Sequence, residues 1–276
     1  MDDNKLGKNP WEDITVKSLL LSVDKTNPWD DNQAYVSPAD RDYVRKYNLR
    51  LGVCDNDDYR FHLELPPEPW QGNPKEAKVI ILTLNPGYVE SANTVIAKLL
   101  KKAKCYKDLL RFKERVLKLD ADSMMPKKTA SNSNEITTFE AFNALGDWYW
   151  VEKLRHLKDD YLKSRIPEGC ELNAKKQIEL ENKFYKNFAV LEYCAYTSKS
   201  YKEFPGVSEL PSVKYAQDIL EEIIANENKV IVVLRKRWEQ FLNNRPYITV
   251  KSPKCQYLTP GNVGEEGYNI ILNALE

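Results

Sequence analysis

Short hydrophobic runs and segments with a helical pattern alternate through most of this chain. The run KVIILTL, residues 78–84, is continuously apolar, as in strands that are covered on both faces of a parallel sheet. Similar runs predict three more strands, at residues 188–196, 230–234 and 247–250. Helices are predicted between and after them, at residues 96–118, 138–163, 173–183, 212–226, 236–243 and 265–275.

This alternation predicts an α/β fold, a three-layer α/β/α sandwich with a central four-stranded parallel sheet. The sandwich is expected to occupy residues 78–276, and a segment without periodicity at about residues 120–135 is expected to be a mobile insertion. Residues 1–77 are expected to pack on this core as an N-terminal extension. The extension is predicted to contain helices at 14–23 and 38–47, a strand at 61–65 (FHLEL), and then a loop rich in proline and glycine.

Composition limits the classes of protein to which the chain can belong. With 276 residues and 42% hydrophobic residues, it can bury one large core. Five separated cysteines and two histidines form no metal-binding spacing, so we expect no metal ion and no other cofactor. No apolar run approaches the roughly 18 residues that cross a bilayer, and the first residues lack a secretory pattern, which predicts a cytoplasmic protein with no membrane partner. The composition does not indicate an oligomeric state.

Charge changes the picture locally. The chain has 41 basic and 41 acidic residues, which argues against binding nucleic acid by bulk charge. Basic residues nevertheless gather at residues 98–118 and 235–254, which predicts two local basic surfaces. The alternative interpretation is that both segments are ordinary solvated helix faces.

Polar or glycine-containing segments follow each predicted core strand. Because ligands of open parallel sheets bind at the carboxyl ends of the strands, these segments are the candidate site. The residues are Asn85, Pro86, Gly87 and Tyr88 after the first strand, Tyr196, Ser198 and Lys199 after the second, Arg235 and Arg237 after the third, and Lys251, Ser252, Lys254, Tyr257 and Leu258 after the fourth.

Asn85 begins the most informative of these segments. Pro86 favours extended geometry at Asn85, and Gly87 leaves room for a ligand to approach the backbone. The amide of Asn85 has one donor face and one acceptor face, which suit the orientation of a water molecule or the edge of a planar heterocycle. Asn-Pro-Gly is also a favoured turn sequence, so a turn without further function is the alternative.

The segment TLNPG after a buried strand, together with the C-terminal loop SPKCQYL, resembles motifs of the uracil-DNA glycosylase superfamily, nearest its mismatch-directed G-x-N-P-G branch. That family's fold, a four-stranded parallel sheet between helices, agrees with the predicted element order. The resemblance would span residues 78–276. The sequence departs from the family at two places, because Thr83 stands where the branch has glycine and Ser252 stands where the family usually has histidine or asparagine.

The resemblance implies a role for each candidate residue. Asn85 would position the attacking water, Gly87 would leave the pocket wide, and Ser252 would act from the second motif. Tyr88 would stack on a flipped base, although core packing explains it equally well. The remaining candidates fall into three groups: a base-edge or phosphate group of Pro86, Tyr196, Ser198 and Lys199, a wedge at Tyr257 or Leu258, and a phosphate-backbone group of Arg235, Arg237, Lys251 and Lys254.

Three functions follow from these features. The first is a divergent DNA glycosylase that hydrolyses the N-glycosidic bond of a flipped base, with DNA as its partner. The second is a non-catalytic module of the same fold that binds nucleic acid or a nucleotide, in phage or host-defence biology. The retained Asn85 favours the enzyme, and the altered second motif favours the module. A third, a small-molecule enzyme, would show no oligonucleotide binding even at low salt.

Overall fold

The computed structural model describes residues 6–11, 36–50, 58–63, 67–88, 149–166, 173–225, 228–252 and 254–276. The predicted helices at residues 14–23 and 96–118 and the predicted insertion at 120–135 lie outside these residues, as does Pro253 of the C-terminal loop. Among the described helices, none has the length and apolar character needed to cross a bilayer.

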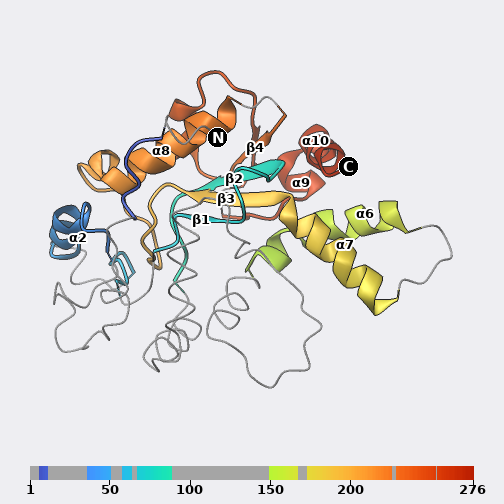
Figure 1. Ribbon diagram of the computed structural model, residues 1–276, viewed down its shortest axis with the longest axis horizontal. Coiled ribbons are helices and arrows are strands. Elements are labelled where there is room, and N and C mark those ends of the chain that lie inside the picture. Colours follow the sequence, from blue (N-terminus) through green and yellow to red (C-terminus); the bar gives the residue numbers. More distant parts are fainter. Residues whose placement is uncertain are drawn as a thin grey trace.

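The chain is an α/β protein built on a mixed, mostly parallel sheet of five strands in the order β1-β3-β2-β4-β5 (Figure 1). The four predicted strands are present as β2 (Val79–Thr83), β3 (Phe188–Glu192), β4 (Val230–Val233) and β5 (Ile248–Thr249). They pair in parallel, β3 with β2, β2 with β4 and β4 with β5. Their carboxyl ends therefore lie at one edge of the sheet, as predicted.

The fifth strand, β1 (Trp70–Gln71), runs antiparallel to β3 in a segment that the sequence predicted to be a loop. Gly72 makes this close approach to β3 feasible, because its φ is 79° and an added Cβ would lie 2.3 Å from the carbonyl oxygen of Phe188. The strand predicted at 61–65 is wrong for its described part, since residues 61–63 form no strand.

Helices cover both faces of the sheet because the side chains of the central strands are apolar on both sides. One face packs against α2 (Arg41–Asn48) and α8 (Pro211–Ile224), and the other against α6 (Arg155–Arg165), α7 (Ala174–Lys186) and α10 (Glu265–Ala274). Figure 1 shows α8 and α7 on opposite sides of the sheet. Each isoleucine, leucine or valine buried in these two clusters contributes about 1.5–3 kcal/mol.

Local sequence explains where these helices begin. Pro211 is the first residue of α8, and the side chain of Asn173 accepts a hydrogen bond of 2.9 Å from the amide of Lys176 to cap α7. The helix predicted at residues 38–47 begins later than expected, and Ser37 does not cap it. Its hydroxyl donates instead to the carbonyl of Pro10, and α2 begins at Arg41 after a turn.

Three further short elements lie among the described residues. These are the 3-10 helices η1 (Val207–Glu209) and η2 (Lys236–Phe241) and the four-residue helix α9 (Pro260–Val263). The segment predicted as a helix at 236–243 thus forms a 3-10 helix, directly after the carboxyl end of β4.

Candidate functional site

The chain segments that leave β2 and β3 continue side by side beyond the sheet. The amides of Tyr193 and Cys194 donate to the carbonyls of Thr83 and Leu84 at 3.1 and 2.7 Å. Farther out, Gly87 and Ser198 form a parallel β-bridge, and the backbone amide of Tyr88 donates to the carbonyl oxygen of Ser198 at 3.1 Å. The structure therefore brings together the candidate residues that follow the first and second predicted strands.

The amide of Asn85 is the centre of this region. Its Nδ2 donates to the hydroxyl of Ser198 at 2.8 Å and to the carbonyl oxygens of Pro86 and Tyr196 at 3.1 and 3.2 Å. Three acceptors thus surround the nitrogen, and they fix which way the amide faces. Its Oδ1 consequently points away from these acceptors, and the half-buried residue can accept a hydrogen bond there from water or from a ligand.

Gly87 lies in the open beside this amide. It is exposed, its φ is outside the left-handed region, and a Cβ added to it would meet no atom within 4 Å among the described residues. The backbone conformation therefore does not require glycine here. Because glycine has no side chain, the space beside its Cα contains no described atom.

Tyr88 is half-buried and already has an aromatic neighbour. Its ring stacks on the ring of His62, with centroids 3.6 Å apart and planes 13° apart. The ammonium of Lys199 lies 5.7 Å from the Tyr88 centroid and 4.0 Å from a carboxylate oxygen of Asp58. One face of Tyr88 is thus covered by His62, so a flipped base would have to stack on the other face.

Tyr196 does not present its side chain to this region. The residue is 2% exposed, and its hydroxyl donates to a carboxylate oxygen of Asp40 at 2.6 Å. Burial, together with the negative charge of Asp40, raises the pKa of Tyr196. Tyr196 therefore contributes its carbonyl to Asn85, and its ring belongs to the core, which corrects the prediction of a side chain at the mouth of the strand.

The side chain of Asn262 bonds to the loop after β5 at two places. Its Oδ1 accepts from the amide of Ser252 at 3.0 Å, and its Nδ2 donates to the carbonyl of Tyr257 at 2.9 Å. Ser252, Lys251 and Lys254 are exposed on this loop. This loop and Asn85 lie at the same edge of the sheet, and β4 separates the strands that precede them, β5 and β2, by two strand spacings, about 10 Å.

The two predicted wedge residues have different environments. Leu258 is completely buried in the core cluster on the α6, α7 and α10 face, so it cannot enter DNA without leaving that core. Tyr257 is half-buried, and the ammonium of Lys153 lies 3.9 Å from its ring centroid. Of the pair, Tyr257 is the residue that reaches the surface.

The two arginines after β4 also differ. Arg237 forms an ion pair of 2.9 Å with Glu203 and donates to the hydroxyl of Tyr193 at 3.2 Å. Burial opposes the charge of Arg237, but these two partners hold its pKa above the usual value. Arg235 is half-buried at the start of η2. Arg237 is therefore largely engaged within the protein, and the exposed Lys251 and Lys254 are the more accessible cations.

A buried carboxyl group that sequence reasoning missed lies at the same edge of the sheet. Glu192 is the last residue of β3 and 4% exposed, and it pairs in register with Thr83, the last residue of β2. The hydroxyl of Thr83 donates to Oε2 of Glu192. Burial raises the pKa of Glu192 to about 8, and the negative charge of Glu68 adds to this effect. The carboxyl group is therefore mostly protonated at neutral pH.

Other polar side chains surround this carboxyl group. The side chain of Gln71 donates through Nε2 to Glu68 at 3.0 Å, while its buried Oε1 has no hydrogen-bond partner among the described residues. Tyr149 interacts electrostatically with both Glu192 and Arg235, and its hydroxyl donates to Gln256 on the loop after β5. Tyr149 thus connects the end of β3 with the C-terminal loop. A single acid inside an apolar run, VLEY, is the only signal of this group in the sequence.

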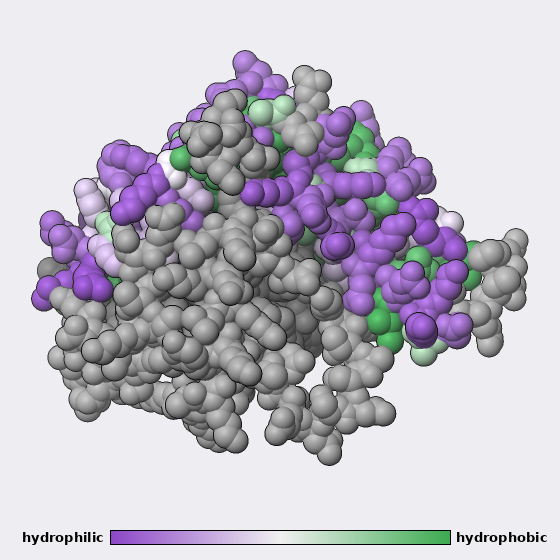
Figure 2. Space-filling view, in the orientation of Figure 1, coloured by the Kyte–Doolittle hydropathy of each residue, from purple (hydrophilic) through white to green (hydrophobic). Residues whose placement is uncertain are grey.

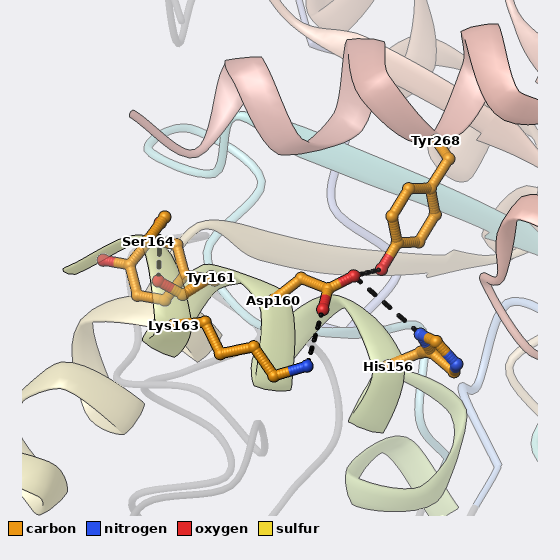
Figure 3. Close-up of polar contacts among 6 residues, drawn as sticks. All are labelled: His156, Asp160, Tyr161, Lys163, Ser164 and Tyr268. Carbon is orange, nitrogen blue, oxygen red and sulfur yellow. Dashed lines mark hydrogen bonds and ion pairs between the residues drawn. The ribbon is translucent and has the colours of Figure 1, made fainter. Parts of the chain in front are cut away.

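A second polar cluster lies away from this edge, between α6 and α10 (Figure 3). Asp160 accepts from the hydroxyl of Tyr268 at 2.8 Å and pairs with Lys163 at 3.3 Å, and His156 approaches it to 3.9 Å. Burial alone would raise the pKa of Asp160, but the bonds from Tyr268 and Lys163 hold it below the usual range. This cluster fastens one helix to the other, and neither it nor any other group of described residues has the donors for a metal site.

The described surface visible in Figure 2 adds no further candidate site. In the view of Figure 2 the described surface is mostly hydrophilic, with small apolar patches between the polar side chains. Comparisons with protein-family models, with curated proteins and with solved structures find no match to this chain. The residues at the carboxyl edge of the sheet are thus the observations that bear on function.

Proposed function

We propose that this protein is a divergent DNA glycosylase that hydrolyses the N-glycosidic bond of a base flipped out of DNA. The orientation of the Asn85 amide carries the proposal. With Nδ2 held by three acceptors, Oδ1 is fixed as the acceptor that a nucleophilic water needs. The resemblance of TLNPG to the G-x-N-P-G motif and the parallel order of β2 to β5 add support.

The substrate side of the proposal rests on the neighbours of Asn85. No described atom lies within 4 Å of a Cβ placed on Gly87, which suits a planar ring, including one with a 5-substituent, and the aromatic ring of Tyr88 nearby is of the kind on which a base stacks. Lys199, Lys251 and Lys254 are exposed at the same edge and supply positive charge for phosphates. DNA is thus the proposed partner. The proposed fold is the three-layer α/β/α sandwich that the resemblance implies.

Asn85 is uncharged and does not remove a proton from water efficiently, so slow turnover is expected. The reaction then depends on positioning and on stabilisation of the departing base. Ser252 is exposed and can donate a hydrogen bond, but about 10 Å of sheet separates its strand from that of Asn85. The altered second motif thus supports the alternative, a non-catalytic nucleic-acid-binding module.

One experiment separates the two functions. The purified chain is incubated with single-stranded and mismatched oligonucleotides that carry uracil, hypoxanthine, xanthine or a 5-substituted uracil, and abasic sites are detected by alkaline cleavage. Asn85→Ala should reduce release at least 100-fold while changing oligonucleotide affinity less than about threefold.

The matched control is Asn187→Ala, which removes an asparagine from the opposite, amino edge of the sheet, where it bonds to Lys183. That variant should release base at the wild-type rate. Binding without any abasic product would establish the module instead. Absence of both binding and release at low salt would contradict both functions.

A further inference from the structure

Glu192 and Asn85 occupy neighbouring positions at the carboxyl edge. Glu192 is opposite Thr83 in the parallel register, and Asn85 follows Thr83 by two residues, about 7 Å of extended chain. A ring held at the Asn85 amide would therefore lie within reach of a group on the last residue of β3.

The environment keeps the Glu192 carboxyl group protonated. Burial favours the neutral form, Glu68 and Tyr149 add to this effect when they are charged, and Arg235 opposes it. Cys194, another titratable group that interacts with Glu192, is itself buried and has a raised pKa. A protonated carboxyl group is a hydrogen-bond donor, which a carboxylate is not.

Thr83 occupies one of the two oxygens of this carboxyl group. Its hydroxyl donates to Oε2, which leaves Oε1 as the oxygen that can carry the proton of the neutral acid and donate it. On the same face of the sheet, the buried Oε1 of Gln71 has no donor among the described residues. Gln71 is paired with Val190, two residues before Glu192, so a donor proton and an acceptor without a described donor lie on the same face of neighbouring strands, an arrangement that a nucleobase edge can satisfy.

Hydrolysis of an N-glycosidic bond also requires that the negative charge on the departing base be neutralised. The serine at position 252 lacks the imidazole that the related motif usually supplies, so another group must do this. We propose that Glu192 is the general acid of this site, donating its Oε1 proton to the departing base, and that Thr83 is its positioning residue. This assignment rests on the proposed glycosylase function.

In the proposed step, the bond between C1′ and the base nitrogen breaks, its electron pair goes to the base, and the Glu192 proton goes to the same base. The water at Asn85 Oδ1 bonds to C1′ and releases one proton to solvent, from which Glu192 is protonated again. The products are the free base and the sugar with a hydroxyl at C1′. Bases that leave poorly without protonation, such as hypoxanthine and xanthine, gain most from this step.

The test compares single-turnover release by wild type, Glu192→Gln and Glu181→Gln, with the hypoxanthine oligonucleotide as the probe. Glu181→Gln makes the same chemical change at another buried glutamate, on α7. Glu192→Gln should lose 10²- to 10⁴-fold in rate, and Glu181→Gln should keep the wild-type rate. Equal rates for wild type and Glu192→Gln overturn the assignment and leave the proposed function intact. A wild-type chain that releases no base overturns the proposed function itself.

A pH profile gives a second readout that a purely structural role would not move. The wild-type rate should fall tenfold per pH unit above about pH 8. Thr83→Val should shift this fall to higher pH, because the Thr83 hydroxyl stabilises the charged form of Glu192. If Glu192→Gln does not fold, as judged by circular dichroism, the Thr83→Val profile decides, and an unshifted fall overturns the assignment.

Discussion

Thr83 and Glu192, the last residues of two adjacent parallel strands, are joined by a hydrogen bond between their side chains although 109 positions separate them in sequence. Burial outweighs this bond and raises the pKa of Glu192 to about 8, so the acid is mostly neutral at physiological pH, which affects stability as well as chemistry. The folded chain binds a proton at Glu192 that the unfolded chain has already released.

Stability should therefore fall as the pH rises from about 4.5, the ordinary glutamate value, to about 8, because in this window the folded state holds more protons than the unfolded state. Asp40, whose pKa burial also raises, contributes in the same direction. Glu192→Gln should remove ~4 kcal/mol of this pH dependence. Urea denaturation of wild type and Glu192→Gln at pH 5, 7 and 8.5 measures the free energy of unfolding at each pH. The same dependence on pH in both proteins would contradict the prediction.

Gly87 gives a prediction about the size of the substrate. Because a Cβ would meet no described atom within 4 Å and the φ of Gly87 is not left-handed, Gly87→Phe should change the free energy of unfolding by less than about 1 kcal/mol. The ring should fill the space beside Asn85 and stop release of 5-substituted bases, while uracil release falls less than about tenfold. Comparing both substrates on one enzyme preparation tests this, and equal losses for both would show that Gly87 does not set base size.

Asp40 is a stability residue in the core. Its two carboxylate oxygens accept from the hydroxyl of Tyr196 at 2.6 Å and from the amide of Ser212, in the first turn of α8, at 3.1 Å. Asp40→Ala would leave both donors buried without an acceptor, so it should lower the free energy of unfolding by about 2–4 kcal/mol. Chemical denaturation measures the loss. The exposed Asp42, on the same helix end, provides the control variant Asp42→Ala, which should change stability by less than about 0.5 kcal/mol.

Lys251 and Lys254 give a prediction about nucleic-acid binding. If both contact phosphates of single-stranded DNA, their joint replacement by alanine should reduce the slope of log K against log salt by about 1.4 and weaken binding several-fold. Fluorescence anisotropy from 50 to 200 mM salt measures the slope. Alanines at Lys183 and Lys186, exposed at the amino edge of the sheet, should leave it unchanged. A slope that changes equally in both double variants would place the DNA elsewhere.

The sequence was sufficient for the parallel strands and most described helices, because an apolar run such as residues 79–83 has few other structures open to it. It was insufficient for β1, since two residues within a segment rich in proline and glycine carry no periodicity. The start of α2 was misplaced by three residues because Ser37 and Pro38 satisfy the local rules for a helix start while a tertiary hydrogen bond of Ser37 to Pro10 decides otherwise.

The candidate site was predictable to the level of strand ends and no further. Asn85, Gly87 and Ser198 do come together, because parallel strands finish at one edge. Position after a strand does not say where a side chain points, so Tyr196 and Leu258 were assigned outward although both are buried. Glu192 was not predicted as a site residue, because the sequence does not show whether an acid in an apolar run is exposed to solvent or buried beneath helices.

The lengths of the outermost strands affect the tendency of this protein to aggregate at high concentration. Both β1 and β5, at the two margins of the sheet, contain only two residues, and Gly72 turns the chain sharply against β3 directly after β1. An exposed strand recruits a second molecule by offering a long row of unpaired amides and carbonyls. Strands of two residues present few unpaired amides and carbonyls, so they protect the parallel strands between them from pairing with another molecule and hence from fibril growth.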